Sequence, residues 1–435
     1  MTSLPSGRAG TTVRPRAAVV GSGVAGLTAA YVLQRRYDVT LFEADDRLGG
    51  HAHTHDVRAP SGSVASIDTG FIVHNRRTYP LLRRLFRELA VDTQDTEMSM
   101  SVRCRECGLQ YAGARGIRGL AADHRTLARP AYLRMLAEVT RFHRQAREAL
   151  AGARASSAPD DWTLGDFLAA GRYSCYFTDH FVMPLVSAVW STPPGSSALQ
   201  PTRNLFEFLD RHGMLSVRGS PSWQTVVGGS RTYVDRVAER LSSVRTWTPV
   251  RTVTRGWDRV EIHDDSDRAH TFDHAVIATH PDQALGMLTA PTIAQKEILG
   301  AFEYTHNDAV LHTDASILPS NPRASASWNY LKPSCSSTEG RPLVSYHLNR
   351  LMRLDQPLDY LVTLNAAGWV AEASVIERMR YAHPVYTTES LAARLRLPEI
   401  SDGVLAFAGA YHGWGFHEDG CISGARAAAA LGVDW

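Results

Sequence analysis

The sequence predicts an α/β chain, α+β overall, in which one parallel sheet is interrupted by inserted segments that form a second, mixed domain. Three observations carry this prediction. A strand, a glycine-rich turn and a helix follow one another over residues 17–36. A strand pattern returns at 272–279, and another at 404–409 precedes an alanine-rich helix that opens near Ser423. The pieces of one sheet are therefore separated by long intervening segments.

Length and composition set the bounds of the function. A chain of 435 residues has room for roughly two or three domains and a large core. The formal net charge is +2, so an electrostatic footprint for nucleic acid is absent. No apolar run has the length of a membrane span, and residues 1–13 are expected to be a flexible tail. Five unevenly spread cysteines favour a reducing cytoplasm, with peripheral membrane contact left open.

The glycine-rich turn has the spacing of a dinucleotide-binding loop. Apolar residues 17–20 form the expected strand, and the pattern G-x-G-x-x-G follows at once. The first glycine allows the tight turn, the second lets the backbone approach a pyrophosphate, and the third lets the helix pack on the sheet. The N-terminus of that helix presents free N–H groups to phosphates. The expected cofactor contacts are Gly21, Gly23, Val24, Ala25 and Gly26.

Two further motifs decide which dinucleotide is bound. The second strand pattern, 39–42, ends in Glu43 and Ala44, where the acid that binds a ribose hydroxyl pair is expected. The run RLGGH at 47–51 follows directly, and DTGF at 68–71 comes after a short loop. An acid, R-x-G-G and D-x-G in this order resemble the FAD-binding signature of flavin amine oxidases, phytoene desaturases and their relatives. NAD dehydrogenases lack the second motif at this spacing, so FAD is the expected cofactor.

That resemblance implies a glutathione-reductase-like Rossmann FAD domain, discontinuous in sequence, within an amine-oxidase-like architecture. It places the R-x-G-G segment near the pyrophosphate and ribityl chain, D-x-G near the isoalloxazine, and the last strand and helix over the flavin. It also has the backbone of Val250, at the start of an expected hairpin over 250–263, pair with adenine. The cofactor-binding residues implied are Arg47, Gly49, Gly50, His51, Gly70, Phe71, Val250, Thr279, Gly409, Phe416, His417 and Gly420.

A narrower resemblance covers nearly the whole chain after residue 14. The sequence is similar to a bacterial "predicted NAD/FAD-binding protein" family within the flavin amine oxidoreductase and phytoene desaturase-like superfamily. The resemblance implies a neighbouring methyltransferase of the cyclopropane-fatty-acid-synthase type as a functional partner, and chemistry on acyl chains. This sequence departs from the family at His347 and at Cys421–Ile422. The segments that carry the resemblance are 68–73, 211–215, 226–234, 326–330 and 409–420.

The expected FAD domain comprises 14–75, 223–285 and 395–435, and a substrate domain comprises 76–222 and 286–394. Residues 130–150 have helical spacing, with Leu133, Leu136, Phe142 and Ala146 expected on one face, and 163–190 are expected to add one or two helices. Apolar helices over a flavin suit a bulky apolar substrate, although they equally suit plain core.

Hydride transfer at a carbon–carbon bond needs a substrate stacked on the flavin, exclusion of water and, in some cases, a proton acceptor. His412 and His417 are the first candidates for general acid or base, followed by Tyr330, Tyr346 and His347. The expected function is FAD-dependent desaturation, oxidation or isomerisation of a hydrophobic substrate.

Two alternatives remain. An amine or amino-acid oxidase that releases peroxide would bind a carboxylate through an arginine such as Arg76, Arg77 or Arg203. By the resemblance, however, Phe416 replaces a tyrosine of the amine oxidase aromatic pair, and neither lysine of the chain matches the flavin-side lysine. The other alternative is a non-catalytic flavin-binding partner of the methyltransferase.

Cys104 and Cys107 form a C-x-x-C pair, which is half of a zinc ribbon. No second pair follows at the usual spacing. His51, His53 and His55 alternate along one side of an extended segment and could complete a site in space. The interpretation favoured is a reduced pair in a loop or hairpin, and no metal site is expected.

Overall fold

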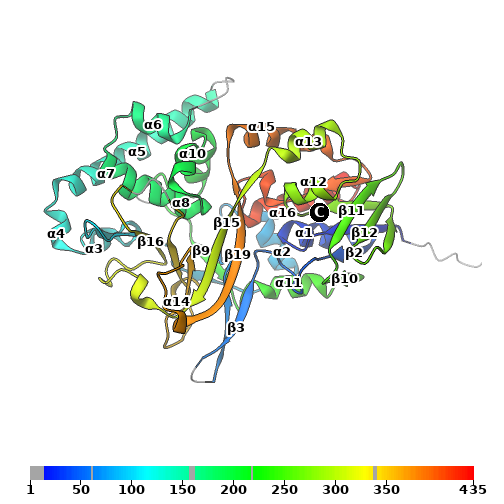
Figure 1. Ribbon diagram of the computed structural model, residues 1–435, viewed down its shortest axis with the longest axis horizontal. Helices are drawn as coiled ribbons and strands as arrows, with labels where there is room; N and C mark the ends of the chain where they lie inside the picture. The colour runs from blue at the N-terminus through cyan, green and yellow to red at the C-terminus, as the bar shows by residue number, and fades with distance from the viewer. Residues whose placement is uncertain (1–13, 60–61, 156–161, 217–218, 337–339) are drawn as a thin grey trace, which may run out of the picture.

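The computed structural model describes residues 14–59, 62–155, 162–216, 219–336 and 340–435. The expected tail at 1–13 lies outside these residues. Two regions lie side by side in Figure 1: the parallel sheet with α1 and α16 on the right, and a helical layer over a second sheet on the left. The long strands β15 and β19 run between them. None of the helices described is both long and apolar enough to cross a membrane.

The parallel sheet has the strand order β10-β2-β1-β14-β20. Ala18 of the central strand pairs with Thr40 on one side and with Ala275 on the other. The sheet is assembled from three distant parts of the chain, and these parts fall within the three ranges expected for the FAD domain. The strands are β1 (Arg16–Val20), β2 (Asp38–Phe42), β10 (Ser243–Arg245), β14 (His274–Ile277) and β20 (Leu405–Phe407).

Two helices with small side chains cover one face of this sheet. Almost every residue of α1 (Val24–Leu33) is buried, and α16 (His417–Ala430) packs directly on it. A Cβ at Gly424 would lie 2.2 Å from the carbonyl oxygen of Ala25, so the close approach requires glycine. The expectation that the last helix opens at Ser423 is wrong. It begins at His417 because the Asp419 carboxylate accepts the N–H of Phe416 and caps the first turn.

An antiparallel meander covers the other face. It comprises β11 (Val250–Arg255), β12 (Val260–Asp264) and β13 (Ala269–Phe272). The expected hairpin over 250–263 is confirmed by the pairing of Val253 with Ile262. The strand expected over 272–279 is shorter, because Phe272 pairs with Val260 and closes the meander. The chain joins the parallel sheet only from His274 onward, where β14 pairs with β1.

A seven-stranded sheet forms the base of the second region, in the order β19-β15-β18-β17-β16-β7-β8. Its neighbours are antiparallel except β16 and β7, which run parallel and join the two inserted segments. Each segment alone would leave an open sheet edge, so the two are folded as one body. The strands are β7 (Met100–Cys104), β8 (Gln110–Ala112), β15 (Glu303–His312), β16 (Trp328–Lys332), β17 (Val344–His347), β18 (Leu361–Leu364) and β19 (Val375–Val385).

Helices pack on this sheet, the longest being α5 (Pro130–Ala155). Phe142 and Ala146 of α5 are buried as expected, but Leu133 is 50% exposed, so its placement on the inner face was wrong. Tyr132 and Met135 hold that face instead. Residues 163–190 contain several short elements rather than one or two helices. The further elements of this layer are α6 (Leu164–Ala170), α7 (Cys175–Phe177), the π-helical turn η2 (Thr178–Val182), α8 (Met183–Trp190), α9 (Pro194–Ala198) and α10 (Thr202–Arg211).

Smaller elements connect the two regions. Strand β9 lies between β5 and β6 in a sheet that crosses the boundaries expected at 75 and 222, so these boundaries stay a prediction. Ile298 and Leu299 of α13 share a core with the meander. The remaining α-helices and strands of the described residues are β3 (Thr54–Arg58), β4 (Val64–Asp68), β5 (Val73–Asn75), α2 (Pro80–Glu88), β6 (Thr93–Thr96), α3 (Gly116–Leu120), α4 (His124–Leu127), β9 (Trp223–Val226), α11 (Arg231–Ala238), α12 (Pro281–Met287), α13 (Ile293–Gly300), α14 (Leu348–Leu351) and α15 (Thr388–Arg396).

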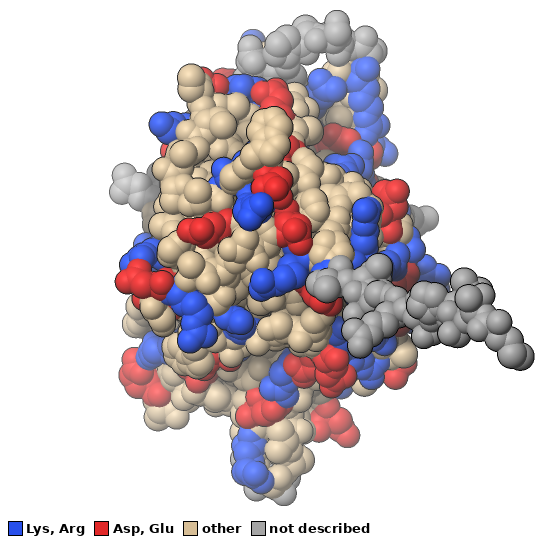
Figure 2. Space-filling model, turned by 90° about the vertical axis from the view of Figure 1, so that its right-hand side faces the viewer, with Lys and Arg blue, Asp and Glu red and all other residues tan. Residues whose placement is uncertain are grey.

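The surface charge is mixed on the face shown in Figure 2. Lysine and arginine side chains are interspersed there with aspartate and glutamate rather than gathered into one field. The net charge of +2 agrees with this distribution.

Candidate active site

The glycine loop between β1 and α1 has three glycines with different constraints. Gly21 has a φ of +96°, and a Cβ on it would lie 2.9 Å from the carbonyl oxygen of Ala278. A Cβ on Gly26 would lie only 1.9 Å from the carbonyl oxygen of Gly21. A Cβ on Gly23, in contrast, would meet nothing within 4 Å. Gly21 and Gly26 are therefore required by the fold itself, whereas Gly23 leaves open space at the helix N-terminus, which fits the approach of a pyrophosphate.

Glu43 stands beside this loop at the end of β2. One carboxylate oxygen accepts the Ser22 N–H at 2.9 Å, and the other accepts the Asp45 N–H at 3.0 Å. These bonds fix the carboxylate at the carboxyl edge of the sheet, next to the open space at Gly23. Ala44 follows it. This is the position from which an acid reaches the ribose of a dinucleotide.

The R-x-G-G segment is folded back onto the glycine loop. A Cβ on Gly50, which has a φ of +56°, would lie 3.1 Å from the Cα of Gly23. The guanidinium of Arg47 donates to the Gly50 carbonyl at 2.8 Å, and the Gly49 N–H donates to the Ser22 carbonyl at 3.1 Å. Two motifs separated in sequence thus line one space, as the FAD signature predicts.

The D-x-G segment contains a buried aspartate that holds the fold and two predicted cofactor contacts, Gly70 and Phe71. Asp68 is buried and accepts hydrogen bonds from Thr54 and from the N–H and hydroxyl of Ser230, and burial raises its pKa to about 6. It ties β4 to β3 and to the start of α11. Gly70 lies against the backbone of His51, where a Cβ would be 2.1 Å from the carbonyl oxygen. Phe71 donates its N–H to that same carbonyl at 2.7 Å.

The remaining cofactor candidates reach the loop from other elements. The methyl carbon of Thr279 lies 3.1 Å from the Cβ position of Gly21, and Val24 lies against Gly420 of α16. The Gly409 N–H donates to the Ser423 hydroxyl at 2.9 Å, which joins the last strand to the last helix. Val250 begins β11, and its pairing with adenine stays a prediction.

His417 is the first residue of α16 and stacks on Phe71, with ring centroids 3.8 Å apart and planes 13° from parallel. Burial lowers the pKa of His417 to about 3, so the imidazole is neutral at pH 7. Its Nε2 atom is buried and has no hydrogen-bond partner among the residues described. The Nε2 atom of His412 is also buried without a hydrogen-bond partner among the residues described, and burial lowers the pKa of His412 to about 4. Orphaned buried polar atoms of this kind fit a bound group with polar edges.

Phe416 begins a group of packed aromatic rings, here the aromatic wall, that continues into the second region. Its ring stacks on Phe208 at 4.7 Å and lies 6.4 Å from Trp190. Trp190 donates its indole N–H to the Trp414 carbonyl at 3.3 Å, and the ring of Trp414 is 6.2 Å from that of Phe208. His212 stacks on Phe208 at 4.0 Å. Helices α8 and α10 therefore present rings to the residue that precedes α16.

The other three catalytic candidates lie on the seven-stranded sheet. Tyr330 and Tyr346 hydrogen-bond the hydroxyls of Ser187 and Ser191, so both face α8. His347 is held between Asp359, at 2.9 Å from its Nε2, and the guanidinium of Arg350, which donates to its Nδ1 at 3.1 Å. These contacts give the two tyrosines and His347 structural partners, and their catalytic roles stay predictions.

A second group of polar side chains lies beside His51, an expected cofactor contact, and includes Asn307 of β15 and Tyr381 and His383 of β19, which sequence reasoning missed. The ring of His51 lies 5.1 Å from that of Tyr381 and 5.5 Å from that of His383. Asn307 donates to the Ser191 carbonyl at 3.0 Å and lies 3.1 Å from Nδ1 of His383. The alternation of β19 puts residues 381 and 383 on one face. No local motif marks them, because their proximity to His51 exists only after the two regions pack together.

Comparison with known proteins agrees with this geometry. The family model for flavin-containing amine oxidoreductases matches residues 24–313. Cyclohexylamine oxidase from Brevibacterium oxydans is 15% identical, with a TM-score of 0.64 over 96% of this chain and 98% of that chain. A CLA-producing fatty acid isomerase from P. acnes is 14% identical, with a TM-score of 0.66 over 96% of this chain and 99% of that chain. At such identities the likeness shows the fold alone.

A curated relative matches over a much shorter stretch. Tryptophan 2-monooxygenase from Allorhizobium ampelinum is 50% identical over 46 residues, which are 10% of this chain and 6% of that protein. The chain therefore spans only a small fraction of this relative.

Proposed function

The chain belongs to the flavin-containing amine oxidoreductase family and is an FAD-dependent oxidoreductase, and we propose that it transfers a hydride between FAD and a hydrophobic substrate, an acyl chain in particular. The reaction proposed is a desaturation, an oxidation or an isomerisation. The observation that carries the proposal is the aromatic wall formed by Trp190, Phe208, Trp414 and Phe416.

The wall suits an apolar substrate because its members are rings that pack on one another. Trp190 and Phe208 belong to one core cluster together with Tyr330, and Trp414, Phe416 and Tyr346 pack against that cluster. Trp190 and Phe208 are themselves buried, so a hydrocarbon would be bound against the partly exposed rings of Trp414 and Phe416. Its burial would exclude water and contribute about 25 cal/mol per Å² of apolar area. Exclusion of water also protects a hydride transfer from side reactions.

The buried carboxylates of α16 are not available to an ammonium group. Glu418 accepts the N–H groups of Leu81 and Leu82, both at 2.9 Å, and so caps α2. Asp419 accepts the N–H of Phe416 at 3.0 Å. Burial raises the pKa of Glu418 to about 7 and that of Asp419 to about 6. A protonated amine would thus have to compete with backbone donors for partly neutral acids.

When bound, FAD supplies the hydride acceptor, and the protein supplies position and environment. Gly23 and the N-terminus of α1 receive the pyrophosphate, and Glu43 the ribose. His417 holds a neutral imidazole with a free Nε2 at the N-terminus of α16, where the helix dipole favours negative charge. Its stacking on Phe71 fixes the ring plane. His412 is the other imidazole able to take or give a proton at this end of the sheet.

The likeness to a fatty acid isomerase and the narrower family resemblance both support the acyl chain as substrate. We propose a methyltransferase that acts on unsaturated acyl chains as the functional partner. The alternative is an amine or amino-acid oxidase that releases peroxide. It is supported by the likeness to cyclohexylamine oxidase, whose name states the substrate of that protein.

Anaerobic reduction of the purified holoenzyme separates the two functions. The bound flavin is expected to bleach with unsaturated fatty acids or acyl esters, and to stay oxidised with cyclohexylamine, putrescine or tryptophan. A redox-neutral isomerisation does not bleach the flavin. It would be detected by incubating pre-reduced enzyme with the same acyl substrates and separating the double-bond isomers by chromatography. Bleaching by an amine, with peroxide formed on readmission of air, would overturn the proposal. The Gly23→Asp variant, which should fold without FAD, is the matched control.

A further inference from the structure

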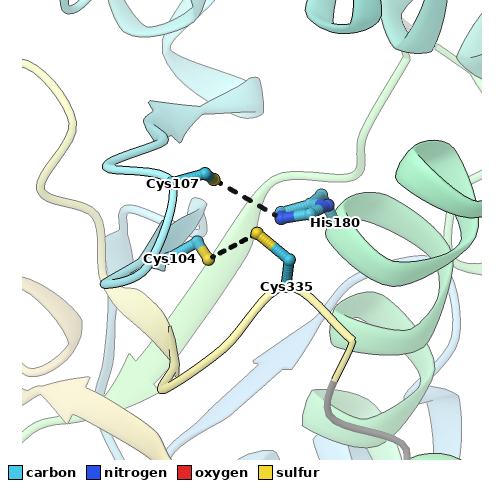
Figure 3. Close-up of side chains that lie close together, drawn as sticks. All are labelled: Cys104, Cys107, His180 and Cys335. Carbon is cyan, nitrogen blue, oxygen red and sulfur yellow. Dashed lines mark hydrogen bonds between the residues drawn. The ribbon is translucent and has the colours of Figure 1, made fainter.

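Four metal-ligating side chains meet where the helical layer contacts the seven-stranded sheet (Figure 3). They are Cys104, Cys107, Cys335 and His180, and their ligand atoms all lie within 4.8 Å of one another. The sulfurs of Cys104 and Cys335 are 3.6 Å apart, and the sulfur of Cys107 is 3.7 Å from Nε2 of His180. Cys104 and His180 are each 1% exposed. From this arrangement we infer a structural zinc site with three thiolate ligands and one imidazole.

The distances match the edges of a zinc tetrahedron. With Zn–S bonds of about 2.3 Å and Zn–N bonds of about 2.0 Å, ligand atoms of a tetrahedral site are separated by roughly 3.5–3.8 Å. The Cys104–Cys335 and Cys107–His180 separations of 3.6 and 3.7 Å have these values. A disulfide between Cys104 and Cys335 would need a sulfur separation of about 2.05 Å. All five cysteines of the chain are free thiols.

The imidazole is oriented for a metal. Nδ1 of His180 lies 3.1 Å from the carbonyl oxygen of Tyr176, which can only accept, so Nδ1 carries the proton. The lone pair is then on Nε2, which is the atom that faces the sulfurs. A backbone carbonyl on the outer nitrogen is the usual support of a zinc-bound histidine. His180 also lies in the π-helical turn η2, an insertion that proteins commonly keep at functional sites.

The C-x-x-C pair has the backbone of a metal-binding turn. Gly108 follows the second cysteine with a φ of +69°, which favours glycine and turns the chain back. The N–H groups of Cys107 and Leu109 donate to the sulfurs of Cys104 and Cys107. Such bonds stabilise thiolates. Arg129 donates to the Cys107 carbonyl at 2.7 Å and adds positive charge beside a site of net charge −1.

The zinc would join segments far apart in the sequence. Cys104 ends β7, Cys335 follows β16, and His180 lies directly before α8. One ion would therefore fix α8, which carries Ser187 and leads to Trp190, to the sheet that carries Tyr330. None of the four ligands belongs to the cofactor motifs, so the ion would act as a structural link that holds α8, and with it Trp190 of the aromatic wall, against the sheet. This inference is independent of the proposed substrate.

The lack of a second cysteine pair was the reason for expecting no metal. The structure supplies the missing ligands from one histidine and one cysteine, each on its own segment, and sequence spacing does not show such a set. The alternating histidines lie elsewhere: the rings of His53 and His55 pack at 4.0 Å beside Tyr381.

Metal analysis of the purified holoenzyme tests the inference. The wild-type chain from zinc-supplemented cells is expected to carry about one zinc per chain by elemental analysis and by native mass spectrometry. Growth with Co²⁺ should give the visible bands of tetrahedral thiolate-bound cobalt, at wavelengths beyond the flavin absorption. Removal of zinc with a chelator should lower the thermal midpoint by several degrees, while FAD content is retained.

The control variant is Cys175→Ser, since Cys175 is exposed and outside the cluster. It should keep the metal, and Cys107→Ser and His180→Gln should lose it. Should those two variants not fold, zinc release from the wild type in step with thiol modification gives the same answer. A wild-type chain that holds neither zinc nor cobalt in stoichiometric amount would overturn the inference, and so would an intact mass that shows a Cys104–Cys335 disulfide.

Discussion

The half that contains the parallel sheet (the cofactor half) and the half built on the seven-stranded sheet, proposed to bind the substrate (the substrate half), are built in opposite ways. The cofactor half places its predicted binding residues in short motifs: Gly21, Gly23 and Gly26 lie between the end of β1 and the first turn of α1, and Glu43 follows the next strand. The substrate half brings together single residues from distant segments: Trp190, Phe208 and Phe416 form one wall, and Cys104, His180 and Cys335 one cluster. Local backbone geometry therefore sets the positions of the predicted cofactor-binding residues, and tertiary packing sets which side chains would face the cofactor.

The difference also separates two kinds of constraint. In the cofactor half a side chain is excluded by backbone contact, as at Gly26. In the substrate half the rings of the wall can change size at moderate cost, since aromatic contacts tolerate some repacking. Substitutions in the cofactor half should therefore cause a large loss of folding or FAD binding, whereas substitutions in the aromatic wall should cause smaller, graded losses of activity.

The largest effect is expected at Gly26. In Gly26→Ala the added Cβ would be forced against the carbonyl oxygen of Gly21, so α1 must move off the sheet. We expect loss of bound FAD and of most folded protein, read from the ratio of flavin to protein absorbance and from circular dichroism. Gly23→Ala is the matched control, because its Cβ meets open space. It should keep the fold and lower only the affinity for FAD; equal behaviour of the two variants would contradict the account.

Acid should affect the two halves differently. Burial lowers the pKa of His143, His212 and His312 in the substrate half to about 4. These imidazoles protonate near pH 6.5 only in the unfolded chain, so stability is lost as the pH falls from about 6.5 towards 4. We expect a loss on the order of 5 kcal/mol between pH 6.5 and 5 in this half, about 1.6 kcal/mol for each imidazole.

The cofactor half has opposing groups. Burial lowers the pKa of His53 and His417 to about 3, that of His74 and His412 to about 4, and that of His51 well below its usual value. Burial also raises the pKa of Asp68, Glu418 and Asp419 to about 6, 7 and 6, which offsets part of the effect of these histidines. A carboxyl group whose pKa is raised in the folded protein contributes stability that is present below its unfolded pKa and is lost as the pH rises through its folded pKa. Hydrogen exchange at pH 7 and pH 5, corrected for its intrinsic pH dependence, should show faster opening first in the substrate half; the reverse order would be inconsistent with these shifts.

Asp68→Ala should lower the free energy of unfolding by about 3 kcal/mol, because the buried donors of Thr54 and Ser230 lose their acceptor. Asp68→Asn keeps one acceptor oxygen and should cost less. Chemical denaturation of both variants measures the difference. Asp68→Ala at wild-type stability would show that the D-x-G aspartate does not hold β4 to α11.

The smallest effect is expected at the wall. Phe416→Ala removes the ring that stacks on Phe208 and should lower kcat/KM for an acyl substrate, measured per bound FAD, about tenfold, which is about 1.4 kcal/mol. Phe416→Tyr keeps the ring and should stay within a few-fold of the wild type. A gain of amine oxidation in Phe416→Tyr would favour the alternative function.

Sequence alone predicts the cofactor half well because each step there is local. The strand at 16–20, the glycine loop, the acid at 43 and the order of the three motifs follow from spacing and backbone sterics. The start of the last helix is missed because Asp419 caps Phe416, and the exposure of Leu133 because the phase of a long helix is set by its partners.

The substrate half is predictable only in outline. Helical spacing is visible at 130–150, but the contacts of His51 with Tyr381 and His383 need β19 in place. The same holds for Cys335 and His180, which are separated by more than a hundred residues from each other. A local motif can show half of such a site and no more.

The measurement that tests the central claim most directly is mass spectrometry of acyl chains from cells that express the wild-type chain with a companion methyltransferase. Cells with the FAD-free Gly23→Asp variant serve as the reference. The account predicts acyl species that have lost two hydrogens, gained an oxygen or changed double-bond position in the wild-type cells alone. Identical acyl profiles in both, together with amine-dependent peroxide release by the purified enzyme, would contradict it.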